Sequence, residues 1–144
     1  MNLLVIDAHG GGLGKQLVSE LRKQFPSLVI TAVGTNTMAA SVMLKAGATH
    51  AATGENAVIV GCRKADIIVG PLAIVIADAM DGEITPRMAL AVAQSNAKRI
   101  LIPFNHCENI VVGIHDYNLS ELVREAVSEV GQSLKAASDN DRLP

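Results

Sequence analysis

The sequence predicts an α/β protein in which helices cover both faces of a mainly parallel sheet of about five to six strands. Three observations support this three-layer sandwich. Short apolar runs alternate with helical patterns, a glycine-rich turn separates the first strand from the first helix, and the composition is rich in aliphatic residues. Hydrophobic residues make up 49% of the 144 residues and aromatic residues only 2%, so the core must consist of Val, Ile, Leu, Ala and Met.

The first strand and the turn after it, with the sequence VIDAHGGGLGKQL, organise the rest of the prediction. Residues 2–7 are almost all apolar, and the helix after the turn places on one face Leu13, Leu17, Val18, Leu21 and Phe25. The turn contains Gly10, Gly11, Gly12 and Gly14. In Rossmann-like proteins, the N–H groups of such a turn and the positive end of the helix bind a phosphate. We therefore expect a Rossmann-like nucleotide-binding domain.

The glycine spacing favours a dinucleotide, although it departs from the strict G-x-G-x-x-G pattern. Counted from Gly10, the sixth position is Lys15. Gly12 and Gly14 instead resemble the last two glycines of short-chain dehydrogenase turns, and the first glycine of that pattern would fall on Ala8.

Two alternatives for the turn stay open. The segment from Gly11 to Lys15 also resembles the deviant P-loop of ParA-like ATPases. However, Gln16 stands where that loop needs a Ser or Thr hydroxyl for Mg²⁺, and Gly10 replaces its signature lysine. Dinucleotide binding therefore ranks above ATP hydrolysis. The second alternative is a glycine-rich connection that binds nothing.

The second strand, residues 28–33, leads into Gly34, Thr35 and Asn36. An NAD-binding domain usually has an acidic residue here for the ribose 2′-hydroxyl, but the next carboxylate of this chain is Glu55. Hydroxyl and amide groups could instead hydrogen-bond the 2′-phosphate of NADP, although no arginine stands at this position. The expected cofactor is NADP or NAD.

The middle of the chain continues the alternation of helices and strands. We expect a helix over 37–46, which Gly47 ends, and then a strand over 48–52. A helix should follow from Thr53 to about Lys64, with a strand over 57–62 as the alternative. The next expected element is a strand over 66–69, which Gly70 and Pro71 end. Residues 72–80, LAIVIADAM, are nearly all apolar and predict a buried helix. In a chain of this size we expect that helix to form a homodimer interface.

The last third of the chain has clear helix signals. Thr85 and Pro86 suit the N-cap and first position of a helix that runs to about Asn96. A strand over 99–103 and a short edge strand or hairpin arm over 110–114 follow, and Asn118 with Glu121 forms a capping box for the last helix. We expect a single domain over residues 1–137 and a polar, disordered tail over 138–144.

The turns after successive strands are expected to meet at one edge of the sheet, because ligands of open α/β sheets bind beyond the carboxyl ends of the strands. These turns are built almost entirely from Gly, Thr, Asn and Pro. The candidate binding residues are His9, Gly10, Gly11, Gly12, Leu13, Gly14, Lys15, Gly34, Thr35, Asn36, Thr53, Gly70, Pro71 and Asn105.

Several other functions have little support. His106, Cys107 and His115 match no zinc spacing, so no metal is expected, and Tyr117 has no lysine four residues later, which disfavours short-chain dehydrogenase chemistry. The net charge of −2, without a basic stripe, disfavours nucleic acid. No signal peptide or membrane-length apolar run is present, and Cys62 and Cys107 suggest no disulfide framework, so we expect a cytoplasmic protein.

The chain as a whole resembles a family of short bacterial proteins catalogued as domain of unknown function 3842. The stretches that carry the resemblance are VIDAHGGGLGKQL, VGTNTMAASVMLKAGA, ATGENAVIV, DIIVGPLAIVIADAMDGEITPRMA and AKRILIPFNHC. The resemblance implies a Rossmann-like, NAD(P)- or nucleotide-binding protein and supplies no reaction or catalytic residue.

The leading hypothesis is therefore a protein that binds a dinucleotide or a related small phosphate-bearing ligand, as a sensor or accessory subunit. The alternatives are a small NAD(P)-dependent oxidoreductase with a pocket across a dimer, a degenerate P-loop ATP binder, and an interaction module without a ligand.

Overall fold

A parallel five-stranded sheet forms the centre of the structure, a computed structural model that describes residues 1–104, 109–115 and 118–140. The strand order is β3-β2-β1-β4-β5, and every neighbouring pair is parallel. The strands are β1 (Leu3–Asp7), β2 (Ile30–Gly34), β3 (His50–Thr53), β4 (Ile67–Pro71) and β5 (Lys98–Ile102). The predicted parallel α/β sheet is confirmed.

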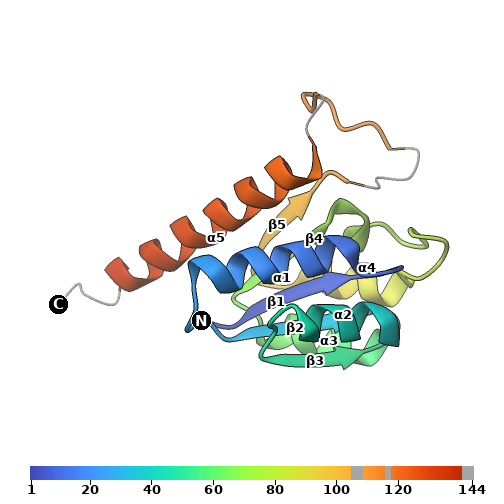
Figure 1. Cartoon of the computed structure of the whole chain (residues 1–144). Coiled ribbons are helices and arrows are strands. Elements are labelled where there is room, and N and C mark those ends of the chain that lie inside the picture. Colours follow the sequence, from blue (N-terminus) through green and yellow to red (C-terminus); the bar gives the residue numbers. More distant parts are fainter. Residues whose placement is uncertain (105–108, 116–117, 141–144) are drawn as a thin grey trace.

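Helices cover both faces of this sheet and complete the three-layer, Rossmann-like sandwich (Figure 1). One face carries α1 (Gly12–Gln24), α2 (Thr37–Lys45) and α5 (Leu119–Asn140). The other carries α3 (Glu55–Lys64), the short 3-10 helix η1 (Leu72–Val75) and α4 (Pro86–Gln94).

The sequence of β1 explains its central place in the sheet. All five of its residues are buried. Side chains of a strand point alternately to its two faces, so Leu3 and Val5 enter the hydrophobic cluster beneath α1 and α5, whereas Leu4 and Ile6 enter the cluster beneath α3 and α4. An apolar run without alternation is what a strand covered on both faces requires.

The strand order reverses beside β1. The chain moves outward from β1 to β2 and β3, then returns to place β4 on the other side of β1, where Leu3 pairs with Ile67. At such a switch point, the connections after the two central strands leave toward opposite faces and open a crevice at the carboxyl edge. The glycine turn after β1 lies at this edge.

Two helix signals of the sequence are confirmed. The hydroxyl oxygen of Thr85 accepts a hydrogen bond from the backbone N–H of Met88 at 3.2 Å, with Pro86 as the first residue of α4. The capping box before α5 forms as well, because Asn118 Oδ1 accepts a hydrogen bond from the N–H of Glu121 at 2.9 Å. Residues 55–64 form a helix, so the alternative of a strand over 57–62 is wrong.

The prediction of a long helix over 72–80 is wrong. Only Leu72–Val75 are helical, as a 3-10 turn, and a series of turns follows. Ala73, Ile74 and Met80 are buried in the chain's own core beneath α4. Burial within the chain therefore accounts for much of the apolar character of this segment, and a homodimer through it stays an untested prediction.

Two further expectations differ from the structure. Residues 110–114 form no strand, and their side chains include Ile110 and Val112, which are 90% and 94% exposed. Helix α5 continues to Asn140, so residues 138–140 are helical rather than disordered, and the Ser138 hydroxyl donates a hydrogen bond to the carbonyl of Leu134. Residues 141–144 lie outside the described part of the chain. No helix among the described residues is long and apolar enough to cross a membrane.

Candidate functional site

The glycine turn connects β1 to α1 in four residues. The N–H of Gly11 donates a hydrogen bond to the carbonyl of Ala8 at 3.0 Å and closes the turn. His9 and Gly11 both adopt left-handed backbone conformations, with φ of 52° and 72°. This conformation is ordinary for glycine and costs energy for histidine. As a result, Gly12, the first residue of α1, lies at the carboxyl edge of the sheet.

The side chain of Asp7 stabilises the turn through hydrogen bonds to its backbone. Its side chain is 2% exposed, and its two carboxylate oxygens accept hydrogen bonds from the N–H groups of Ala8 at 2.8 Å and Gly14 at 2.7 Å. Burial raises the pKa of the Asp7 carboxyl, while the hydrogen bonds from Gly14 and Ala8 act in the opposite direction. Because Gly14 is the third residue of α1, Asp7 satisfies one of the free N–H donors of the helix terminus.

The first two donors of α1 stay available. Among the described residues, no hydrogen-bond acceptor contacts the backbone N–H of Gly12 or Leu13. Both donors lie at the start of a helix of 13 residues, where the helix dipole also favours an anion. The turn can therefore offer two backbone donors to a ligand without disturbing its own fold.

Packing explains some of the glycines in and around the site. A Cβ at Gly11 would lie 2.6 Å from Val42 Cγ2, and one at Gly14 would lie 2.9 Å from Asp7 Cβ. Gly70 is equally constrained, because a Cβ there would lie 2.5 Å from the carbonyl oxygen of Ile6. Gly34 packs closely against the backbone of α2. These glycines are required by the fold itself.

Gly10 and Gly12 have no such explanation. A Cβ at either position would meet no atom within 4 Å, and neither residue has a left-handed backbone conformation. Any small residue would suit the fold at these two positions. Both glycines lie in a turn at the carboxyl edge of the sheet, which is where open α/β sheets bind their ligands.

A cavity of about 320 Å³ opens directly over this turn. It lies at the switch point, between the turn after β1 and the start of η1 after β4. Its walls are mostly apolar, and the residues of the glycine turn contribute to them. The lining residues are Asp7, Ala8, His9, Gly10, Gly11, Gly12, Leu13, Gln16, Pro71, Met80, Phe104 and Leu119.

The end of β2 joins the turn through Glu83, which belongs to the segment between η1 and α4. Oε2 of Glu83 accepts hydrogen bonds from the backbone N–H of His9 at 2.7 Å and from the Thr35 hydroxyl at 2.5 Å. Asn36 Nδ2 donates to the same oxygen at 3.1 Å and to the carbonyl of His9 at 2.8 Å. One carboxylate therefore connects the carboxyl ends of β1 and β2.

Hydrogen bonds to the Glu83 carboxylate favour its ionised form. Burial raises the pKa of Glu83, but the hydrogen bonds from Thr35, His9 and Asn36 outweigh burial and hold the pKa below its ordinary value. Nearby, His9 Nε2 lies 3.1 Å from Oδ2 of Asp81, which is 93% exposed. The segment that carries Asp81 and Glu83 is thus tied to the glycine turn at two points.

The structure brings some of the predicted site residues together and separates others. His9, Gly10, Gly11, Gly12, Leu13 and Pro71 line the cavity, and Thr35 and Asn36 are linked to it through Glu83. Lys15 lies instead over a separate depression between α1 and α5, and Thr53 is exposed at the end of the edge strand β3. Gly14, Gly34 and Gly70 contribute through packing. Asn105 lies outside the described residues, as do His106 and Cys107.

The sequence did not indicate Glu83, Met80 or Leu119 as parts of this edge. Glu83 and His9 are separated by 74 residues, and no local pattern connects them. Asp7 directly follows the apolar residues of β1 and precedes the glycine turn, so its place at this edge could be predicted from the sequence.

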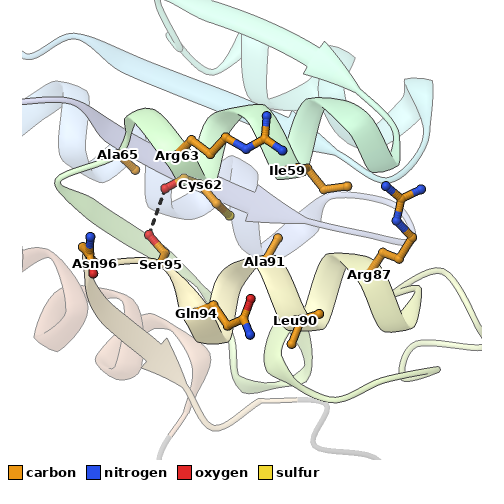
Figure 2. Close-up of a pocket in the computed structure, with 10 residues that line it drawn as sticks. All are labelled: Ile59, Cys62, Arg63, Ala65, Arg87, Leu90, Ala91, Gln94, Ser95 and Asn96. Atoms are coloured by element: carbon orange, nitrogen blue, oxygen red, sulfur yellow. Dashed lines mark hydrogen bonds between the residues drawn. The ribbon is translucent and has the colours of Figure 1, made fainter.

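A larger depression, of about 480 Å³, lies between α3 and α4 (Figure 2). Ile59 of α3 and Leu90 and Ala91 of α4 are among its apolar lining residues, and the Ser95 hydroxyl donates a hydrogen bond to the carbonyl of Cys62 at 2.9 Å. None of the residues that line it belongs to the turns after β1, β2 or β4. We favour the smaller cavity because it carries the unexplained glycines and the free helix donors.

Nothing in the larger depression indicates nucleophilic or metal chemistry. Burial raises the pKa of the Cys62 thiol to about 11, so the thiol stays protonated at neutral pH. Across the described part of the chain, no three His, Cys, Asp or Glu side chains gather into a group that could hold a metal ion. His115 is exposed.

The parallel sheet, its strand order and the glycine turn at the switch point define a Rossmann-like α/β protein. More particularly, the chain belongs to the family described as domain of unknown function (DUF3842), whose family model matches residues 2–135. No curated protein and no solved structure matches the chain significantly.

Proposed function

We propose that the protein binds a nucleotide or dinucleotide, NAD or NADP, with its phosphate groups at the glycine turn. The observation that carries the proposal is that Gly10 and Gly12 line the switch-point cavity although neither packing nor backbone conformation requires glycine there. A phosphate that approaches the backbone closely would explain both.

The donors near these glycines suit an anion. The N–H groups of Gly12 and Leu13 begin α1, where the helix dipole adds favourable charge. Asp7 holds the turn in place before any ligand arrives, so little ordering is needed on binding. Among the described lining residues, His9 alone can carry a positive charge, so backbone donors would supply most of the phosphate contacts.

The walls of the cavity suit the uncharged part of such a ligand. Leu13, Pro71 and Met80 offer apolar surface, and Gln16 adds an amide at the rim. Ligand sites are commonly apolar clefts with a few convergent polar groups. At about 320 Å³ the cavity would hold only part of a dinucleotide, and the rest would extend toward the end of β2.

The placement of Lys15 supports this proposal over a P-loop. In a P-loop the lysine reaches the phosphates. Here Lys15 is exposed over a different depression, beside Ser19 and Arg124, and does not line the cavity, whereas Gln16 lines both. We propose a binding role, as a sensor or accessory subunit, and derive no reaction from these residues.

Thermal unfolding in the presence of NAD, NADP, ATP with Mg²⁺, AMP and inorganic phosphate tests the proposal. A ligand that binds only the native state at 100 times its Kd stabilises it by about 2.7 kcal/mol. We expect such a shift with NAD or NADP. A shift with ATP and Mg²⁺ alone would move the P-loop alternative to first place, and no shift with any ligand would contradict the proposal.

A pair of variants locates the binding site. Gly12→Val places a side chain where the phosphate would lie, whereas Thr37→Val changes the equivalent first residue of α2, which is exposed. We expect the Gly12 variant to fold and to lose the ligand-induced shift, and the Thr37 variant to keep it. Unchanged binding by folded Gly12→Val would remove the glycine turn from the site.

A further inference from the structure

The Glu83 carboxylate lies at the end of β2, where the residues that directly follow the strand are not acidic. In dinucleotide-binding domains of this topology, an acidic residue after the second strand accepts a hydrogen bond from the adenosine ribose. Here Thr35 and Asn36 follow β2, and neither carries a carboxylate. The Glu83 carboxylate reaches the same place from the segment between η1 and α4, at 2.5 Å from Thr35 Oγ1.

One oxygen of this carboxylate retains capacity for a ligand. His9, Thr35 and Asn36 all donate to Oε2, whereas Oε1 receives only a long contact of 3.4 Å from Asn36 Nδ2. An ionised carboxylate has about four acceptor sites in total. The Glu83 side chain is half-buried rather than covered. A hydroxyl group at the end of β2 could therefore donate to Oε1 without displacing the internal hydrogen bonds.

The surroundings of Glu83 favour a hydroxyl over a phosphate. An ionised carboxylate repels a second anion in its immediate neighbourhood. The Thr35 hydroxyl, which could have served a 2′-phosphate, already donates to Glu83. Within the described part of the chain, no lysine or arginine side chain forms a hydrogen bond or ion pair with Glu83, and the His9 ring, whose charge acts on Glu83, is paired with Asp81.

The segment that carries Glu83 is held in an unfavourable conformation. Asp78, Met80 and Asp81 have φ of 62°, 56° and 57°, in the left-handed region that residues other than glycine rarely adopt. Met80 and Ile84 anchor the segment in the core. Backbone strain of this kind persists only where the surrounding structure enforces it, and it gathers at functional sites. Glu83 is therefore a positioned carboxylate and not a freely moving surface acid.

We propose that Glu83 accepts a hydrogen bond from a ribose hydroxyl of the bound nucleotide and selects ligands with a free 2′-hydroxyl over ligands with a 2′-phosphate. The cofactor class is then NAD rather than NADP. This inference rests on the proposed function and deepens it, because it assigns the specificity of the same site to one residue from a distant part of the chain.

Calorimetric titration of the full chain with NAD and with NADP tests the proposal. The variants are Glu83→Gln and, as a matched control, Glu55→Gln, whose carboxylate also accepts a threonine hydroxyl, from Thr85 at 2.6 Å. We expect the unchanged protein to bind NAD at least about tenfold more tightly than NADP. Glu83→Gln should weaken NAD binding and bring the ratio of the two affinities toward one, and Glu55→Gln should keep the ratio.

The outcomes separate this inference from the proposed function. Equal affinities of the unchanged protein for NAD and NADP, or an unchanged ratio in folded Glu83→Gln, would overturn the role of Glu83 and leave the glycine-turn site intact. Failure to bind either cofactor or any other nucleotide would overturn both. If Glu83→Gln does not fold, the unchanged protein is titrated with AMP and with adenosine 2′,5′-bisphosphate. Weaker binding of the bisphosphate supports the proposal, and equal or tighter binding overturns it.

Discussion

Asp7 and Gly14 are joined across the glycine turn, with the backbone N–H of Gly14 donating to Oδ2 of the buried carboxylate at 2.7 Å. The contact explains both residue types. A carboxylate can accept from two N–H groups at once, and a Cβ at Gly14 would lie only 2.9 Å from that of Asp7. The end of β1 and the start of α1 are thus joined by the protein's own hydrogen bonds, which set the shape of the glycine turn.

Replacing Asp7 by asparagine should destabilise the fold by about 1–3 kcal/mol, because the amide NH₂ would face a backbone donor in a buried place. Denaturant unfolding at neutral pH measures the loss. Asp66→Asn is the control, since Asp66 is exposed and its carboxylate accepts a hydrogen bond from the N–H of Asn2. Equal losses in the two variants would contradict the role given to Asp7.

The glycines of the turn should separate into two classes on substitution. Gly11→Ala introduces a left-handed alanine and a Cβ at 2.7 Å from Ala39 Cα, so we expect a loss of about 1–3 kcal/mol. Gly12→Ala meets open space and should change the free energy of unfolding by less than about 0.5 kcal/mol. Comparable destabilisation by both alanines would mean that Gly12 serves the fold after all.

Glu83 should contribute to stability only above acidic pH. Burial raises the pKa of Glu83, but hydrogen bonds from Thr35, His9 and Asn36 together outweigh burial and lower this pKa from the ordinary value of 4.5. A lowered carboxyl pKa stabilises the native state above the unfolded pKa, and the contribution is lost as pH falls through the folded pKa.

The measurement is the difference in unfolding free energy between the unchanged protein and Glu83→Gln. We expect the difference to be constant at neutral pH and to shrink as pH falls below 4.5. A difference that grows on acidification would show that the carboxylate is not stabilised as the structure indicates.

Arg22 should not tolerate lysine, although the charge is kept. Its guanidinium donates to the carbonyls of Pro26, Leu28 and Gly47 at 2.6–3.0 Å and thereby joins the end of α1 to the loop before β3. A lysine ammonium group cannot donate to all of these carbonyls at once, so Arg22→Lys should lower the free energy of unfolding by about 1–3 kcal/mol. Arg63→Lys, at an exposed position on α3, serves as the control and should be nearly neutral. Denaturant unfolding compares the two.

The fold could be predicted from sequence because its signals are local. Uninterrupted apolar runs such as β1 indicate strands buried on both faces, and Thr85 with Pro86 marks a helix start by the hydrogen bond it provides. Residues 72–80 misled the prediction. An apolar segment in a small protein can be buried by turns as well as by a helix, and the left-handed residues Asp78, Met80 and Asp81 leave no mark in the sequence.

The site was predicted only in part, for a related reason. Parallel strands bring their following turns to one edge, so the glycines and Pro71 could be assigned to the same crevice. The acidic residue at the end of β2 could not be found, because the sequence rule looks directly after that strand. The structure supplies the carboxylate from Glu83, 48 residues beyond Thr35, through a contact that only the folded chain creates.

The most direct test of the account is to follow the backbone amide signals of isotopically labelled protein by NMR during titration with NAD. If the nucleotide binds at the switch point, the largest shifts should occur at Gly10, Gly12 and Leu13, followed by residues at the end of β2. Shifts confined to the α3–α4 depression, around Ile59 and Leu90, would show that NAD binds there and not at the glycine turn. An unchanged spectrum at a high NAD concentration would show that NAD does not bind, which would also contradict the proposed function.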